Sequence, residues 1–166
     1  GKTSTKHLLS CSLKTYGTTH LTQGNNNNII GLSLTLSRLD PDTKYCVLEL
    51  GINNIGEMEE LTKLALPNIA LITNVTNSHI QNFKNEKEIA CEKSKIFLGL
   101  KENGIVILNS DSIWKNFLKR KAKEIIANIH LYGHSKNSDT IITKITHEKE
   151  GATICFDNKT DWHLNY

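Results

Sequence analysis

Three short apolar runs, separated by segments of helical length, constrain most strongly the fold of this 166-residue chain. The runs are 45–50, 69–73 and 104–108, and each is short and almost continuously apolar. Strands of this composition are buried on both faces, as in parallel sheets that helices cover. The alternation therefore predicts the α/β class, with a doubly wound, mostly parallel sheet and helices on both of its faces.

The pattern also predicts where the helices lie and where the architecture changes. Helices are expected over 3–13, 29–39, 57–65, 86–100 and 112–122. One more strand is expected at 129–133, and then a hairpin formed by 140–146 and 152–156. We therefore expect a core at 1–133 and a small, truncated antiparallel β extension at 134–166. Because the only methionine is Met58, the chain is expected to be part of a longer protein.

Composition argues against several functional classes. The formal net charge of +3 is too small to indicate nucleic-acid binding. The basic run 115–123 is typical of a solvated helix face, with anion binding as the alternative. The four cysteines form no C-x-x-C pair, which argues against zinc and suits a reducing cytoplasm, and Cys46 is expected to be a buried thiol. Neither a signal peptide nor a span of ~20 apolar residues is found, so we expect a cytoplasmic protein.

The tripeptide Gly1-Lys2-Thr3 opens the first predicted helix. It matches the end of the phosphate-binding motif G-x-x-x-x-G-K-[ST], whose first half would be missing. In that motif the lysine and the N–H groups at the helix start bind phosphates, and the hydroxyl holds Mg²⁺. Such a short match is weak by itself, but it makes Gly1, Lys2, Thr3 and Ser4 candidate nucleotide contacts.

Polar residues also stand where predicted strands end, which is the edge at which doubly wound sheets bind ligands. Glu49 is interpreted either as a Mg²⁺ ligand or as a carboxylate paired with a lysine. His79 is either a site residue or an ordinary surface histidine. Asn109 and Asp111 either contact a nucleotide or only turn and cap the chain.

Lys93 shares one face of its predicted helix with Ile89, Ile96 and Phe97. A lysine on an apolar face either extends its amine to the surface or is desolvated, with a lowered pKa and a reactive amine. The run of asparagines at 25–28 is typical of a turn.

Taken in order, these segments resemble the Mur ligases, the ATP-dependent amino-acid ligases of peptidoglycan synthesis. Order and spacing agree over about the first 115 residues, in the segments 1–6, 24–39, 49–58, 73–79, 92–97 and 104–111. The asparagine-rich loop is most similar to that of the members that add D-alanyl-D-alanine to UDP-N-acetylmuramoyl-tripeptide. Two positions depart from the family pattern, with Ile29 where aspartate is frequent and Asn54 where the family has histidine.

The resemblance implies roles for individual residues. Lys2, His79 and Lys93 would be catalytic, and Gly1, Lys2, Thr3, Ser4 and Asn109 would bind ATP. Thr3, Glu49, His79 and Lys93 would hold two Mg²⁺ ions. Lys93 matches a lysine that CO₂ carbamylates, and the product is an anionic oxygen ligand of the kind that a hard metal requires. Asn25, Asn27 and Asn28 would lie near the substrates.

The implied activity is that of an ADP-forming ligase working through an acyl phosphate. Its substrates would be UDP-N-acetylmuramoyl-tripeptide and D-alanyl-D-alanine. N- and C-terminal domains of the same polypeptide would complete the enzyme, so the isolated domain is expected to be inactive. Three alternatives remain: another ligase of this fold, such as a folylpolyglutamate synthase; a P-loop switch or nucleic-acid-dependent ATPase; and a non-catalytic remnant.

Overall fold

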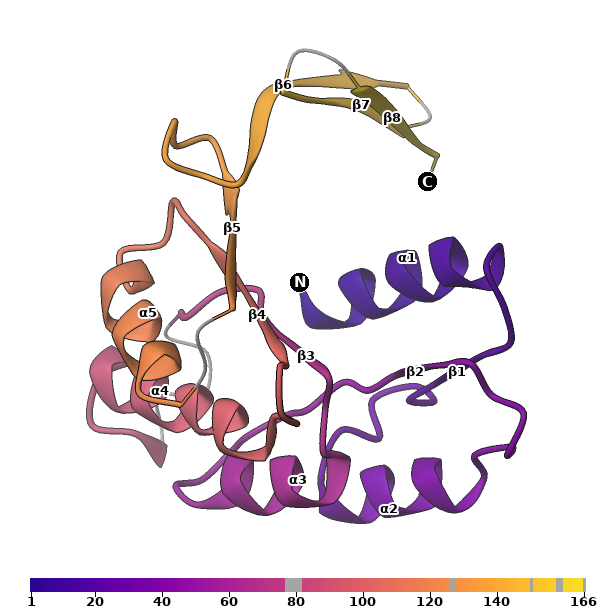
Figure 1. The fold of residues 1–166 in the computed structure, drawn as a ribbon, viewed down its shortest axis with the longest axis vertical. Coiled ribbons are helices and arrows are strands. Elements are labelled where there is room, and N and C mark those ends of the chain that lie inside the picture. The colour runs from indigo at the N-terminus through magenta and orange to yellow at the C-terminus, as the bar shows by residue number, and fades with distance from the viewer. Residues whose placement is uncertain (77–81, 126–127, 150, 158–159, 166) are drawn as a thin grey trace.

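The computed structural model describes residues 1–76, 82–125, 128–149, 151–157 and 160–165. Helices and strands alternate along most of the chain, which ends in four consecutive strands (Figure 1). In order, the elements are α1 (Lys2–Lys14), β1 (Thr19–Leu21), α2 (Ile29–Ser37), β2 (Tyr45–Val47), α3 (Glu57–Ala65), β3 (Ile69–Ile72), α4 (Glu86–Ser94), the 3₁₀-helix η2 (Lys95–Gly99), β4 (Ile105–Asn109), α5 (Lys115–Lys123), β5 (Ile129–Gly133), β6 (Thr140–Glu148), β7 (Gly151–Phe156) and β8 (Thr160–Asn165).

The strands form one parallel pair and one mixed sheet. β1 and β2 pair in parallel, and β3, β4, β5 and β6 pair in parallel in that order. β6, β7 and β8 then pair antiparallel. The α/β class with a mostly parallel sheet and a small antiparallel part, predicted from the sequence, is thereby confirmed.

Helices lie on both sides of the sheet. Figure 1 shows α1 on one side of the β1–β2 pair, and α2 and α3 on the other. One face of β3 and β4 is buried in the core because alternate residues of a strand point the same way. That core combines strand residues with apolar residues of the helices: Ala70, Ile72, Val106, Leu108, Leu131, Leu61, Ile89, Phe97 and Leu118.

Several local expectations differ from the structure, among them the helix predicted over 112–122, which begins only at Lys115. The helix predicted over 86–100 ends at Ser94 and continues as η2, because the chain here packs against α3: Thr62 donates a hydrogen bond to the Ile96 carbonyl at 2.7 Å. The strand predicted over 45–50 is only Tyr45–Val47. Strands β1 and β8 were not predicted. Cys46, expected to be buried, is exposed.

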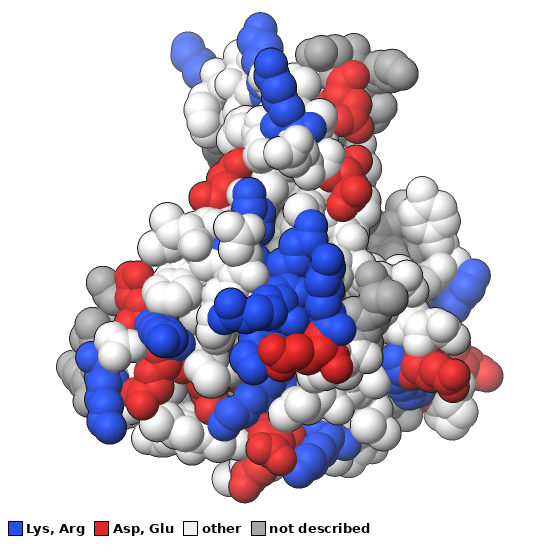
Figure 2. Space-filling view, turned by 60° about the vertical axis from the view of Figure 1, so that its left-hand side comes forward, with Lys and Arg blue, Asp and Glu red and all other residues white. Residues whose placement is uncertain are grey.

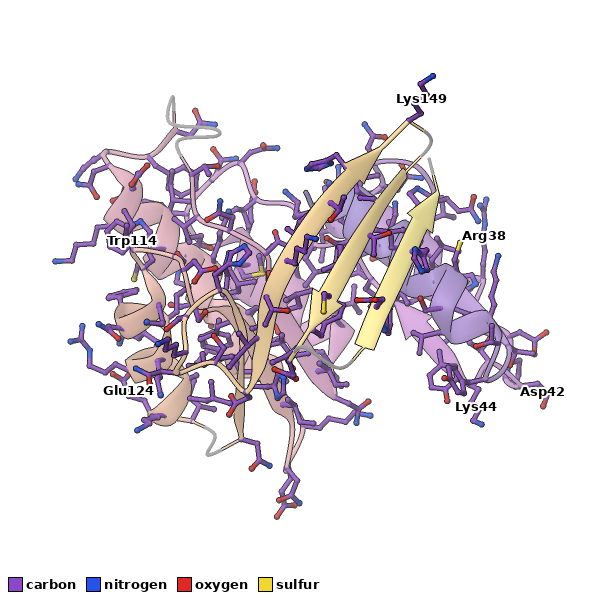
Figure 3. All side chains as sticks on the ribbon, turned by 90° about the horizontal axis from the view of Figure 1, so that it is seen from above. Arg38, Asp42, Lys44, Trp114, Glu124 and Lys149 are labelled. Atoms are coloured by element: carbon purple, nitrogen blue, oxygen red, sulfur yellow. The ribbon has the colours of Figure 1, made fainter. Side chains whose placement is uncertain are left out.

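The antiparallel layer is joined to the parallel sheet through β6, which pairs with β5 at its start and with β7 over most of its length. Figure 1 shows β6, β7 and β8 standing above the start of α1, and Figure 3 shows the same layer from above. The division at residue 133 stays a prediction.

Two features of the surface complete the description. α5 carries the basic run, and Figure 2, which turns the α4–α5 side of the molecule forward, shows Lys and Arg side chains gathered there. None of the helices in the described ranges combines the length and the apolar character needed to cross a bilayer.

Candidate functional site

The start of α1 leaves backbone donors open. Gly1 is its N-cap and offers no side-chain oxygen, and the first turn contains no acidic residue. The first N–H groups of a helix have no partner within the helix, and together with the helix dipole they favour an anion. Lys2, Thr3 and Ser4 are exposed at this end. The arrangement suits phosphate oxygens, and nucleotide binding by Gly1, Lys2, Thr3 and Ser4 stays a prediction.

Glu49 lies just beyond β2 and is only 6% exposed. Its Oε1 accepts a hydrogen bond from Thr3 Oγ1 at 3.3 Å and another from Asn27 Nδ2 at 3.1 Å. Its own N–H donates to Thr22 Oγ1 at 3.0 Å, which anchors the backbone. Two predicted metal ligands, Thr3 and Glu49, are thus brought into contact from segments 46 residues apart.

The second oxygen of Glu49 faces a lysine. Lys6 Nζ lies 3.4 Å from Oε2, and both side chains are buried. From the described part of the chain, Oε2 accepts no hydrogen bond. Burial acts to raise the pKa of Glu49, but the hydrogen bonds from Asn27 and Thr3 and the charge of Lys6 outweigh it, so the pKa lies below its ordinary value. The pairing with a lysine, one of the two interpretations of Glu49, is therefore present, and the carboxylate is ionised at neutral pH.

The same geometry fits a Mg²⁺ ion. A buried, ionised carboxylate oxygen without a hydrogen bond, next to the Thr3–Glu49 contact, supplies the hard oxygen ligands that Mg²⁺ prefers. Among the described residues, no three His, Cys, Asp or Glu side chains gather as a metal site. An ion at Glu49 would therefore need further oxygen ligands from phosphates, water or a modified side chain.

Lys93 points from α4 toward the chain that follows β3. Its Nζ donates to the Asn74 carbonyl at 2.7 Å. Burial first, and the nearby charge of Lys2 second, lower the pKa of Lys93 to about 8. This is the desolvated state that one interpretation of the sequence anticipated, and it places Lys93 close to Lys2 at the start of α1.

The asparagine loop, residues 24–28, is hydrogen-bonded to the segment that carries Glu49. Asn27 binds Glu49 through its side chain and accepts the Gly51 N–H at 2.8 Å through its carbonyl. Asn28 Oδ1 accepts the Gly31 N–H at 2.9 Å and so caps α2. Asn25 is exposed. A Cβ at Gly51 would lie 2.5 Å from Asn27 Oδ1, so a side chain at residue 51 would displace Asn27. Contact of these asparagines with substrates stays a prediction.

Asn109, at the end of β4, and Asp111, just after it, accept hydrogen bonds from backbone N–H groups in turns. Asn109 Oδ1 accepts the Asp111 N–H at 2.8 Å. The two carboxylate oxygens of Asp111 accept the N–H groups of His134 and Ser135 at 2.8 and 3.1 Å. The interpretation as a turn is therefore realised, but Asp111 does not cap the next helix, because α5 begins only at Lys115 with Trp114 as its N-cap. Nucleotide contact by Asn109 stays a prediction. His79 lies outside the described residues.

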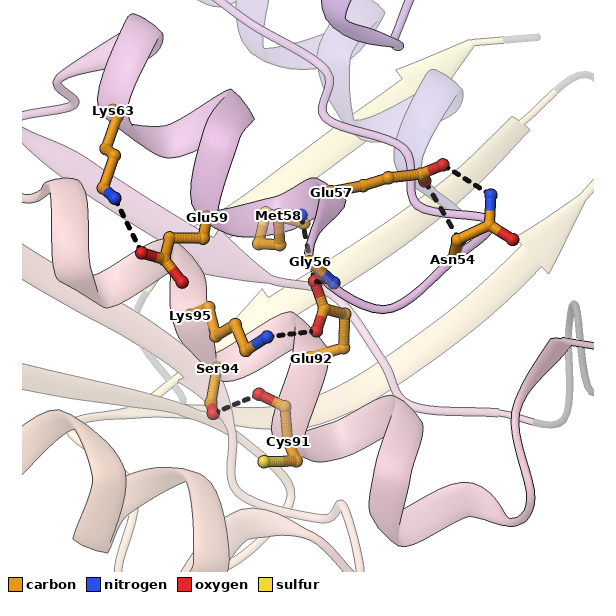
Figure 4. Close-up of polar contacts among 10 residues, drawn as sticks. All are labelled: Asn54, Gly56, Glu57, Met58, Glu59, Lys63, Cys91, Glu92, Ser94 and Lys95. Atoms are coloured by element: carbon orange, nitrogen blue, oxygen red, sulfur yellow. Dashed lines mark hydrogen bonds and ion pairs between the residues drawn. The ribbon is translucent and has the colours of Figure 1, made fainter.

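Sequence reasoning missed one fully buried carboxylate beside Lys93. Glu92 Oε1 accepts the N–H groups of Gly56 and Met58 at 2.9 and 3.0 Å, and its Oε2 pairs with Lys95 Nζ at 2.7 Å (Figure 4). It thereby caps α3 from α4. The sequence patterns also failed to indicate Lys6 and the Asn74 carbonyl as parts of the site. Lys6, Asn74 and Glu92 all lie in the matching motif segments, which is the one signal that could have singled them out, but nothing in the local pattern indicates their partners.

The loop before α3 shows how one departure from the family pattern is accommodated. Asn54 donates to Glu57 through its side chain, to Oε1 at 2.7 Å, and through its N–H, to Oε2 (Figure 4). The N–H of Asn53 also donates to Glu57 Oε2. Burial acts to raise the pKa of Glu57, and these hydrogen bonds outweigh it and lower the pKa. Asn54 therefore stabilises the loop that follows Glu49.

Fold and site together define an α/β domain whose anion-binding helix start adjoins a buried carboxylate. The chain belongs to the Mur ligase family, because the family model described as the Mur ligase middle domain matches residues 1–164. The UDP-N-acetylmuramoyl-tripeptide–D-alanyl-D-alanine ligase of Buchnera aphidicola subsp. Baizongia pistaciae is 42% identical over 153 residues, which are 92% of this chain and 33% of that protein. The chain thus spans about a third of the length of the curated relatives that it matches.

Solved structures agree with this assignment. MurF from Acinetobacter baumannii superimposes with a TM-score of 0.92 at 27% identity, covering 100% of this chain and 36% of that one. MurF from Thermotoga maritima, solved in complex with ADP, gives a TM-score of 0.84 at 25% identity, covering 99% of this chain and 38% of that one. The family resemblance read from the sequence motifs is confirmed.

Proposed function

We propose that this chain is the central ATP-binding domain of a cytoplasmic ligase that joins D-alanyl-D-alanine to UDP-N-acetylmuramoyl-tripeptide. The observation that carries the proposal is the hydrogen bond of Thr3 with Glu49 at the start of α1, where the charge of Lys2 also acts on Lys93. Relatives named for this reaction match over most of the chain. The remaining domains of the polypeptide would supply the rest of both substrate sites.

The reaction proceeds in two steps. A terminal carboxylate oxygen of the tripeptide attacks the γ-phosphorus of ATP, the bond to the β-phosphate oxygen breaks, and ADP leaves. The amine of D-alanyl-D-alanine then attacks the acyl carbon, a C–N bond forms, the C–O bond to phosphate breaks, and the amine loses a proton to water. Because phosphoryl transfer is catalysed mainly by positioning and charge, Lys2 and the N–H groups at the start of α1 hold and neutralise the phosphates.

Bound Mg²⁺ would neutralise phosphate charge and align the two reacting groups. Thr3 and Glu49 are the described residues that would hold it, and His79 remains a predicted ligand. Lys93 would contribute as a carbamate: its neutral amine attacks CO₂, an N–C bond forms, and a proton leaves to water. The product replaces a half-buried cation with an anionic oxygen ligand, which removes the repulsion between Lys93 and Lys2.

The test is ADP release by the full-length protein in the presence of UDP-N-acetylmuramoyl-tripeptide and D-alanyl-D-alanine. We expect release to require both substrates, and Lys2→Ala and Lys93→Ala to lower kcat by about 100-fold or more. The exposed Lys63→Ala variant is the matched control and should keep normal turnover. Turnover with a folate in place of the tripeptide would instead indicate a folylpolyglutamate synthase, and no turnover with either would indicate a non-catalytic remnant. The isolated domain should be inactive.

A further inference from the structure

Lys6 is a buried cation that the proposed reaction does not use. It lies on α1, one turn after Lys2 and Thr3, and is 3% exposed. Burying an ammonium group costs several kcal/mol unless other groups compensate for the lost water. Its two partners come from different segments: the Gly24 carbonyl at 2.6 Å and Glu49 Oε2 at 3.4 Å.

The two contacts are unequal. The shorter one is a hydrogen bond to the backbone of the asparagine loop, at Gly24, whose φ of +52° belongs to the left-handed region. The longer one is an ion pair that leaves Glu49 Oε2 without a hydrogen bond, although that oxygen is fully buried. A charge-assisted N–H···O contact usually closes to about 2.7–2.9 Å. Lys6 therefore compensates the charge of Glu49 without occupying its free oxygen.

The other groups around Glu49 leave the same oxygen open. Thr3 and Asn27 both bind Oε1. Thr22 holds the backbone of Glu49, and the Asn27 carbonyl holds Gly51 two residues later. The carboxylate is thus fixed in one orientation by α1, the asparagine loop and the end of β1. Among the described residues, Thr3 and Asn27 donate to Oε1, and Lys6 faces Oε2 only as an ion pair at 3.4 Å.

We propose that Lys6 limits the affinity of Glu49 Oε2 for a divalent cation and ties the position of this carboxylate to the asparagine loop. The inference rests on the proposed function, since it concerns the same metal site. Lys6 acts in two ways. Its charge repels an incoming cation and so keeps metal binding weak, and its bond to Gly24 couples the position of the loop to the carboxylate.

The test measures binding of Mn²⁺ to the full-length protein with ADP, by the electron paramagnetic resonance signal of free Mn²⁺. Removing a positive charge a few ångströms from the metal ligand should tighten binding, so Lys6→Met should lower the Kd of Mn²⁺ by about tenfold. Residues 24–28 should also exchange their amide hydrogens faster, because the Gly24 carbonyl loses its donor. Lys6→Gln, which is neutral but still offers N–H donors, should tighten Mn²⁺ binding in the same way.

Lys63→Met is the matched control, since Lys63 forms an exposed ion pair with Glu59. A purely structural lysine would leave Mn²⁺ affinity unchanged or weaken it when removed. An unchanged or higher Kd in both Lys6 variants would therefore overturn the inference while the proposed function stands. Absence of Mn²⁺–ADP binding by the unaltered protein would overturn both.

Discussion

At the scale of single residues, Lys93 and Lys2 show how the surroundings of an amine favour its neutral, reactive form. Lys93 is half-buried, has the Asn74 carbonyl as its hydrogen-bond acceptor, and has another cation nearby. Both its burial and the charge of Lys2 favour the neutral amine, which is the form that reacts with CO₂. The lowered pKa therefore has a chemical consequence that can be measured.

We expect carbamylation of Lys93 to depend on pH in a defined direction. Because the pKa is about 8, the neutral fraction of the amine rises as pH increases through that value. A carbamate resonance in ¹³C NMR spectra with ¹³C-bicarbonate should therefore grow between about pH 7 and pH 9. Lys93→Arg should lack the resonance and Lys63→Arg should keep it. A resonance that persists in the Lys93 variant would contradict the assignment.

The sequence predicted part of the candidate site. The positions of Thr3 and Glu49 at one edge, and the desolvation of Lys93, follow from strand ends and from helix periodicity. The partnership of Lys6 with Gly24 and Glu49 does not, because it joins residues 18 and 43 positions apart and depends on how α1 is placed over the loop. A lysine in the first turns of a helix is ordinarily read as solvent-exposed.

At the scale of elements, Glu92 connects the end of α4 to the start of α3. Its Oε1 takes the place of an N-cap side chain, which Gly56 cannot supply. The adjacent residue is Lys93, and α3 follows the loop that begins at Glu49. Glu92 therefore sets the separation between two segments that carry predicted metal ligands.

We expect Glu92→Ala to lower the free energy of unfolding by about 1–3 kcal/mol, because two N–H groups and Lys95 lose their acceptor. Glu92→Gln should cost less, since the amide oxygen can still accept from Gly56 and Met58. Urea denaturation measures both changes. The control is Glu59→Gln, which breaks an exposed ion pair and should leave stability unchanged. Equal stability of all three variants would show that the cap is unimportant.

Element prediction succeeded where the local pattern decides the structure and failed where contacts with other elements decide it. The helix at 57–65 and the strand at 129–133 have the predicted bounds. β1 has three half-buried residues and no alternation that could indicate a strand. The change from α4 to η2 depends on α3, where a Cβ at Gly99 would lie 2.3 Å from the Thr62 carbonyl oxygen. Such close approaches are tertiary and leave no periodic signal.

At the scale of the whole molecule, Asp111 fastens the connection between the parallel and antiparallel parts. Its carboxylate holds the N–H groups of His134 and Ser135 between β5 and β6. The hydrogen bond from the His134 N–H, which has the largest effect, and the one from the Ser135 N–H lower the pKa of Asp111. Their contribution to the free energy of unfolding is therefore present above the ordinary carboxyl pKa of about 4, and it is lost as the pH falls through the lowered pKa.

We expect Asp111→Ala to loosen the antiparallel layer selectively. Amide hydrogens in 134–148 should exchange about tenfold faster or more, because the turn before β6 loses two acceptors. Exchange in β3 and β4 should not change, since those strands are held by their own pairing and core. Hydrogen-exchange mass spectrometry resolves the two regions. Asp42→Ala, in the exposed loop labelled in Figure 3, is the control and should alter neither.

The contact between Gly51 and Asn27 restricts which sequences this domain can adopt during evolution. Any larger residue at 51 would meet the Asn27 side chain at 2.5 Å and push it away from Glu49. A lineage can therefore replace the glycine only after, or together with, a change at 27. The two positions are expected to vary as a pair, although 24 residues separate them along the chain.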